Sequence, residues 1–196
     1  KYISILLASL ILCSNFSYAD DQNYNPISSS VYSLGISPDA VASGMGDVGA
    51  ATNPDVYSQY WNPSKYVFIQ NQAGVALGYT PWLSQLASDI DLAYLSGYYK
   101  LGDRQAFSGS LRYFSLGEVI LRQMLDDEGY EIQPYEMEVD LGYSRLLSEK
   151  FSMGVSMRYI LSDLMSGDDP AGNAFSADIS AFYKTPVYFG RERGSL

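Results

Sequence analysis

Three carboxylates stand at alternate positions of one segment of the chain, and they are the residues with the clearest capacity for chemistry. Glu136, Glu138 and Asp140 occupy positions i, i+2 and i+4, and side chains two residues apart lie on the same face of a β-strand. An acidic ladder of this kind is able to bind a cation or a basic peptide. Arg112 and Arg158, in neighbouring segments, offer the alternative that the ladder is a charge-balanced polar face, and both interpretations stay open.

The residue types needed for several kinds of catalysis are absent from the sequence. It has no histidine, and its one cysteine is Cys13. A Ser-His-Asp triad, a Cys-His dyad and a histidine-ligated metal are therefore impossible within these residues. The acidic runs at 126–128 and 168–169 lack the spacing of a calcium-binding loop. We expect no enzymatic activity and no cofactor or metal site.

Two short motifs stand out before residue 70. Gly44, Gly46 and Gly49 fit the pattern G-x-G-x-x-G, but a dinucleotide-binding motif follows a hydrophobic strand and opens a helix in a βαβ unit. Nothing in the surrounding sequence provides that context, so we expect the glycines to permit close backbone packing. The second motif contains an Asn-Pro turn former and consists of Trp61, Asn62, Pro63 and Ser64.

The rest of the chain is dominated by period-two alternation. Strands are predicted at 73–79, 91–100, 105–114, 135–147, 150–162 and 174–185. In each, an apolar face rich in aromatic residues alternates with a small, polar or charged face, which is typical of a transmembrane β-barrel. The expected fold class is all-β, a transmembrane antiparallel β-barrel, and the expected location is the cell outer membrane.

The connections between these strands alternate in length. Residues 101–104 and 148–149 form short turns, whereas 80–90, 115–134 and 163–173 are long. Outer-membrane barrels have short periplasmic turns and long external loops. The alternation therefore places the short turns on the periplasmic side and the long loops outside the cell.

The first part of the chain has a different organisation. Residues 1–19 are predicted to be a signal peptide, with an apolar stretch at 3–13 and a cleavage site at Ser17-Tyr18-Ala19. Residues 20–65 are predicted to be a polar N-terminal arm followed by a compact loop and short helix rather than a membrane strand. One helix is expected there, starting at Ser37-Pro38-Asp39 with an N-cap and with Pro38 at the first helical position, and ending near Gly44. Residues 66–196 are predicted to be the first strands of the barrel. The net charge of −10 argues against nucleic acid as a partner.

The N-terminal motifs carry a family resemblance. Ala42–Thr52, followed by Tyr60–Ser64, resembles the signature of the FadL-like outer-membrane barrels, in which a glycine-rich segment leads to Asn-Pro-Ala. Ser64 replaces that alanine here. Within that group, the sequence resembles the PorV (LptO) family of the Bacteroidota type IX secretion system through the segments Gly44–Ala51, Gln59–Phe68, Tyr79–Leu83, Leu92–Leu101 and Leu111–Gly117.

The resemblance implies a fourteen-stranded barrel, of which this chain is the N-terminal part. It also implies that residues 20–65 form an N-terminal arm and luminal hatch that plugs the barrel, with Asn62-Pro63 as its turn. It implies that the protein binds the C-terminal signal domain of cargo from the SprA/Sov translocon and passes it to the PorU attachment complex. Membrane lipid and lipopolysaccharide would surround it, and the three long loops would be the candidates for contact with cargo.

Two alternatives follow from the same resemblance. One is a FadL-type carrier for hydrophobic small molecules, which predicts an apolar luminal pocket and a moving hatch. The polar and acidic face of the predicted strands counts against it. The other is a lipid-modifying enzyme, which the absence of histidine disfavours.

Overall fold

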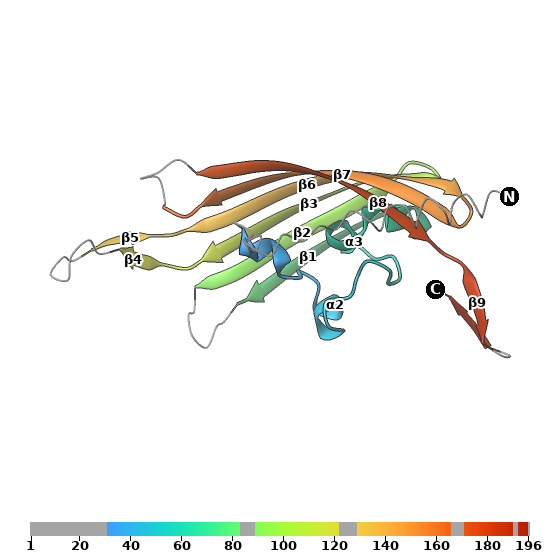
Figure 1. The fold of residues 1–196 in the computed structure, drawn as a ribbon, viewed down its shortest axis with the longest axis horizontal. Coiled ribbons are helices and arrows are strands. Elements are labelled where there is room, and N and C mark those ends of the chain that lie inside the picture. Colours follow the sequence, from blue (N-terminus) through green and yellow to red (C-terminus); the bar gives the residue numbers. More distant parts are fainter. Residues whose placement is uncertain (1–30, 83–88, 122–128, 166–170, 190–191, 196) are drawn as a thin grey trace, which may run out of the picture. The chain divides into compact units, whose positions relative to one another are not determined.

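The computed structural model describes residues 31–82, 89–121, 129–165, 171–189 and 192–195. The predicted signal peptide, 1–19, lies outside the described residues. Six strands form one antiparallel sheet in the order β1-β2-β3-β6-β7-β8 (Figure 1). Their bounds are β1 (Ala73–Pro81), β2 (Ile90–Lys100), β3 (Gln105–Leu116), β6 (Tyr135–Ser148), β7 (Phe151–Asp163) and β8 (Gly172–Tyr183). The expectation of a mainly antiparallel β structure is confirmed, and every strand end lies within two residues of its predicted position.

Two small hairpins accompany this sheet. β4 (Val119–Leu121) pairs with β5 (Tyr130–Ile132), and β9 (Pro186–Phe189) pairs with β10 (Glu192–Ser195). The hairpin of β4 and β5 lies within the long connection 115–134 and was not predicted. Strands of three residues are too short to show a period-two pattern, so the sequence carried no signal for them.

The two faces of the sheet differ sharply in composition and exposure. One face, called the apolar face below, is exposed along its whole length and includes Val75, Leu77, Tyr99, Phe107, Leu111, Leu141, Met157 and Ile179. The opposite polar face is largely buried from β2 to β7 and includes Tyr94, Ser96, Ser110, Arg112, Glu136, Glu138, Asp140, Ser144, Ser152 and Ser156. A water-soluble sheet buries its apolar face, so this arrangement is the inverse of the usual one.

Aromatic residues gather in two bands on the apolar face. Near the short turns, the rings of Phe107 and Tyr143 lie 5.2 Å apart. Towards the long connections, the rings of Tyr113 and Tyr135 are stacked at 5.6 Å. On β6 the two bands are eight residues apart, which corresponds to about 26 Å along a strand. That separation suits the height of the apolar band of an outer-membrane barrel.

The N-terminal segment (residues 31–69) covers the polar face (Figure 1). It contains the short helices η2 (Tyr32–Gly35), α2 (Ala40–Gly44), α3 (Ser58–Trp61) and η3 (Pro63–Phe68). In the described part of the chain, no helix is both long and apolar enough to cross a membrane. η3 contacts the strands β2, β3, β6, β7 and β8, so this segment and the sheet share one interior.

The helix predicted near Ser37 begins two residues later than expected. Its N-cap is Asp39, whose Oδ1 accepts a hydrogen bond from the backbone N–H of Val41 at 2.9 Å. Pro38 precedes the cap, so its assignment to the first helical position was wrong. An aspartate carboxylate caps a helix as well as a serine does, and Ser37 instead lies within hydrogen-bond distance of Asp39. The helix ends at Gly44, as predicted.

Candidate functional site

Asn62 joins three parts of the molecule. Its Oδ1 accepts a hydrogen bond from the backbone N–H of Ser64 at 3.1 Å, which makes it the N-cap of η3, with Pro63 in the first turn. Its Nδ2 donates to the carbonyl oxygens of Ala50 and Ala181, both at 3.1 Å. The Asn-Pro pair therefore starts a helical turn and ties the N-terminal segment to β8.

The three glycines of the predicted motif have different structural roles. A Cβ at Gly49 would overlap the indole ring of Trp61, so this glycine permits the close approach of a large side chain. Gly46 adopts a φ of +83°, a backbone conformation that L side chains rarely adopt. Gly44 meets neither constraint, since nothing lies within 4 Å of its hypothetical Cβ. Only Gly49 lies against the Trp61 motif.

Lys65 fixes the loop that carries Gly49. The side chain is fully buried, and its Nζ donates to the carbonyl oxygen of Gly49 at 2.7 Å and to the Thr52 Oγ1 at 3.1 Å. Burial lowers the pKa of the Lys65 ammonium group, with Asp55 and Asp39 acting in the opposite direction. Both hydrogen-bond acceptors are neutral, so the segment holds a buried cation through dipoles rather than through an ion pair.

Tyr66 anchors the same helix against the sheet. Its ring stacks on Tyr98 of β2 with the centroids 4.9 Å apart. Its hydroxyl donates to the Val56 carbonyl and accepts from the Gln59 N–H, both at 2.8 Å. Burial raises the pKa of the Tyr66 hydroxyl. The Ser152 hydroxyl of β7 adds a hydrogen bond of 2.7 Å to the Ser64 carbonyl, so η3 is fixed to several strands at once.

The acidic ladder lies on the polar face, beneath the N-terminal segment. Glu138 and Asp140 are almost fully buried. Arg158 of β7 bridges them, with its Nε 2.8 Å from Glu138 Oε1 and its Nη2 3.1 Å from Asp140 Oδ2. Glu136 accepts a longer hydrogen bond of 3.4 Å from Ser162. Two of the three carboxylates are thus already occupied by a cation of the chain itself.

Arg112, the second candidate counter-charge, is used differently. It faces Glu138 across β3 and β6, but its Nη2 donates to the backbone carbonyls of Ser33 and Ile36. The guanidinium also lies 5.8 Å from the ring centre of Tyr60. Arg112 therefore links the start of the N-terminal segment to the middle of the sheet.

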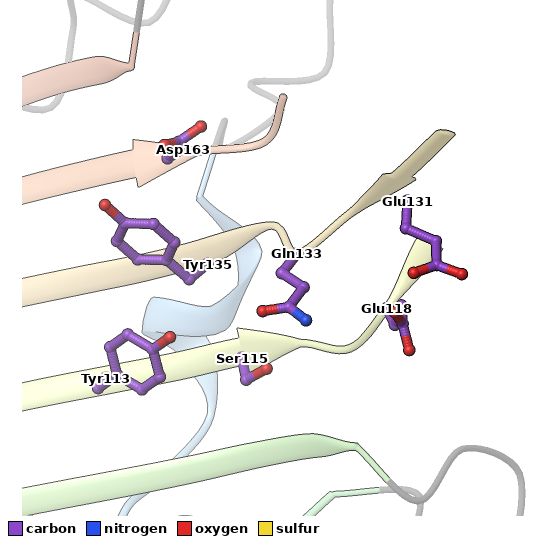
Figure 2. Close-up of a pocket in the computed structure, with 7 residues that line it drawn as sticks. All are labelled: Tyr113, Ser115, Glu118, Glu131, Gln133, Tyr135 and Asp163. Atoms are coloured by element: carbon purple, nitrogen blue, oxygen red, sulfur yellow. The ribbon is translucent and has the colours of Figure 1, made fainter. Parts of the chain in front are cut away.

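A hollow of about 630 Å³ opens at the end of the sheet where the long connections lie (Figure 2). Its walls combine the stacked rings of Tyr113 and Tyr135 with hydroxyl, amide and carboxyl groups from Ser115, Glu118, Glu131, Gln133 and Asp163. A hydrogen bond to the Glu131 carboxyl group raises the pKa of Glu118. In the described residues, no group of three or more Asp, Glu, His or Cys side chains could hold a metal ion.

Charge is distributed unequally between the two ends of the sheet. Among the described residues, the end with the long connections carries Asp89, Asp91, Glu118, Glu131 and Asp163 and no lysine or arginine. The end with the short turns carries Lys100, Arg104, Arg145, Lys150 and Lys184 against Asp103 and Glu149. A partner at the long-connection end therefore meets an acidic surface.

The structure brings together only part of the predicted site. Gly49, Trp61, Asn62 and Ser64 form one packed group, whereas Gly44 and Gly46 lie apart from it and the ladder forms a separate cluster. Sequence reasoning missed Lys65 and Gln59, both buried. A hypothetical Cβ on Gly142 would lie 3.0 Å from the Gln59 amide oxygen, so Gln59 lies against β6. No periodicity or motif indicated either residue.

A comparison with protein-family models identifies the family. The model described as "Type IX secretion system protein PorV" matches residues 19–189, nearly the whole chain. This chain belongs to the PorV family. The expected resemblance is confirmed, and the protein is a component of the type IX secretion system. A search of curated protein sequences finds no match.

The family match covers the parts of the chain whose geometry is described above. It begins at residue 19 and includes the N-terminal segment and all six strands of the main sheet. The packed group around Asn62 and the buried ladder therefore both lie within the PorV region.

Proposed function

We propose that this PorV-family chain is the N-terminal part of an outer-membrane barrel that binds the C-terminal signal domain of secreted cargo. In this proposal residues 1–19 are a signal peptide, the N-terminal segment is a luminal hatch, and further strands complete a fourteen-stranded barrel. The protein would receive cargo from the SprA/Sov translocon and pass it to the PorU attachment complex. The observation that carries the proposal is the PorV match over residues 19–189.

The inverted arrangement of the sheet supports the membrane part of the proposal. An exposed face of Val75, Leu77, Phe107, Leu141 and Ile179 would be unfavourable in water and favourable in hydrocarbon. The two edge strands, β1 and β8, require partners if they lie in lipid, since unpaired backbone groups cost several kcal/mol each there. Further strands of the same barrel would satisfy them.

The N-terminal segment covers the polar face, and this supports binding of cargo rather than transport of a small molecule along that face. The N-terminal segment is fixed to the sheet through Asn62, Ser64, Lys100 and Arg112. Among the described residues, the surface that it covers carries many serines and charged groups, and its apolar side chains already pack against the segment, as Tyr98 does against Tyr66. This packing counts against an open apolar route for a hydrophobic small molecule. The FadL-type carrier remains the second candidate only as an outcome of the test below.

The hollow at the long-connection end is the proposed point of contact with cargo. Five of its seven lining residues belong to two of the three loops expected to meet cargo, 115–134 and 163–173. It also presents two stacked tyrosines beside carboxyl groups. Tyrosine is enriched at the centre of protein interfaces because it combines a large apolar area with a polar group. Acidic groups around it would favour a cargo surface carrying lysine or arginine.

The test is a pull-down of the full-length, detergent-extracted protein under native conditions, read by mass spectrometry. Recovery of proteins that share a C-terminal β-domain, together with a very large barrel, is the expected result. Replacing Glu118 and Glu131 by glutamine should reduce that recovery, whereas Asp103→Asn in a short turn should not. If folded protein recovers neither partner and labelled fatty acid is taken up through it, the carrier function replaces the proposal.

A further inference from the structure

A second hollow lies on the apolar face, far from the acidic end. It has a volume of about 240 Å³ and is lined by Tyr143, Arg145, Met153, Gly154, Val155 and Ile179. These residues come from the three neighbouring strands β6, β7 and β8. Carbon atoms form nearly all of its lining. It is therefore an apolar groove that has a single charged residue among its walls.

The strand register explains why the sheet is hollowed there. Tyr143, Val155 and Ile179 stand side by side in one row across the three strands. In the next row towards the short turns, Arg145 stands beside Met153 and then Ala181. Ala181 has only a methyl group, so large side chains in the first row stand beside a low point in the second.

One end of the groove is polar. Arg145 is exposed, and both ion pairs found among the described residues belong to Arg158, so no described carboxylate neutralises Arg145. Gln105 is its neighbour across β3 and β6, and the Gln105 Oε1 accepts a hydrogen bond of 2.9 Å from the Tyr143 hydroxyl. The groove thus has a cation and an amide at the end nearer the short turns, and apolar walls towards the middle of the sheet.

A polar end that continues into an apolar part is complementary to a lipid, which has a polar headgroup and apolar acyl chains. We propose that the groove binds one glycerophospholipid, with its phosphate at Arg145 and an acyl chain along Val155 and Ile179. The guanidinium group supplies the charge complementary to a phosphate and binds it through paired N–H groups. The inference rests on the proposed outer-membrane location, in which the short turns face the periplasm and meet the leaflet that holds phospholipid.

Native mass spectrometry of the full-length protein with added phosphatidylethanolamine tests the site. One lipid should stay bound to the wild type after activation, and Arg145→Gln should weaken that binding about tenfold through loss of the charge-assisted contact. Val155→Trp should weaken it too, by filling the apolar part with Arg145 intact. Arg104→Gln, an exposed arginine in the neighbouring short turn, should bind as the wild type does. Heat-modifiable migration confirms that each variant is folded.

Each other outcome is decisive. Equal lipid retention by the wild type and both groove variants would overturn the site, and so would a wild type that retains no phospholipid. Preferential retention of lipid A would show that the ligand is not a glycerophospholipid. The pull-down of cargo domains is independent of these results: lipid binding without cargo refutes the proposed function alone, and cargo binding without lipid refutes the groove alone.

Discussion

The two faces of the main sheet follow opposite rules. On the polar face, Glu138 and Asp140 are buried, and a cation from the next strand lies within 3.1 Å of each. On the apolar face, Leu141 and Met157 are mostly exposed, and no described part of the chain covers them. A single alternating strand, β6, supplies residues to both. The chain thus protects its polar groups by its own tertiary contacts and leaves its apolar groups to the medium around it.

The largest expected effect comes from removing the buried counter-charge on the polar face. Arg158→Met would leave Glu138 and Asp140 buried without a counter-charge, and removal of one partner from a buried ion pair costs about 3–5 kcal/mol. The free energy of unfolding, measured in urea for the full-length protein in lipid vesicles, should fall by that amount. Arg104→Met, in an exposed turn, is the control.

Two further substitutions in the Arg158→Met variant should restore part of its stability. Adding Glu138→Gln and Asp140→Asn to Arg158→Met removes the uncompensated charges and should restore part of the lost stability. A loss for Arg158→Met no larger than that of the control would mean that the ladder is hydrated, and the contrast between the two faces would then be weaker than stated.

The next effect tests the exposed face. Leu141 is 66% exposed, so in water an arginine there would be nearly neutral. In lipid, Leu141→Arg near the middle of the strand should cost about 2–4 kcal/mol of the free energy of unfolding in vesicles. Leu147→Arg, close to the short turn, should cost only about 0–1 kcal/mol. Equal costs at the two positions would mean that this face does not contact hydrocarbon.

A smaller effect concerns the segment that covers the polar face. Gly49→Ala would force the Trp61 ring to move, and overpacking of this kind costs about 1–3 kcal/mol. Hydrogen exchange should accelerate in residues 49–65, while the strands keep their protection. Gly44→Ala is a matched control, because open space surrounds that position and alanine favours a helix.

Gly46→Ala should fall between these two variants. Its φ of +83° makes any side chain unfavourable although space is available, and the expected cost is about 1–2 kcal/mol. Identical exchange in all three variants would mean that the packed group around Trp61 does not hold the segment in place.

The smallest effect is a dependence on pH. The pKa of Lys65 is lowered in the folded chain, so between that pKa and 10.5 the unfolded chain binds more protons than the folded one. Stability therefore rises with pH in this window, with a slope of at most about 1.4 kcal/mol per pH unit. The measurement is the free energy of unfolding of the wild type and of Lys65→Met, each at pH 8 and at pH 10. The rise with pH is expected in the wild type and not in the variant.

The upper limit of that measurement is set by Tyr66. Its raised pKa makes the unfolded chain lose the hydroxyl proton first, so stability falls again once the pH exceeds about 10. A wild type whose stability stays level or falls from pH 8 to pH 10 relative to the variant would show that Lys65 is more hydrated than its burial indicates.

The sequence predicted the strands because period-two alternation follows from the local geometry of an extended backbone and does not depend on how the strands are arranged in the fold. Six segments, their bounds and their two faces could be read without coordinates, as could the PorV resemblance carried by five segments between Gly44 and Gly117. The short elements could not be predicted in the same way. The three-residue strand β4 pairs with β5, and the four-residue helix α3 contacts η3 and β3. Neither is long enough to have a period of its own.

Which residues meet was decided by the tertiary structure alone. The Asn62 amide reaches Ala181, 119 positions away, and Arg112 reaches Ser33, 79 positions away. The sequence offered Arg112 and Arg158 as equal partners for the ladder, and register places each beside one of its carboxylates. Arg112 nevertheless donates to the carbonyls of Ser33 and Ile36, and both ion pairs belong to Arg158. The alternation fixes the face on which a side chain lies, because it follows from local backbone geometry. The neighbours of that side chain are fixed by strand register and by the packing of the N-terminal segment on the sheet. Both depend on pairings between distant parts of the chain.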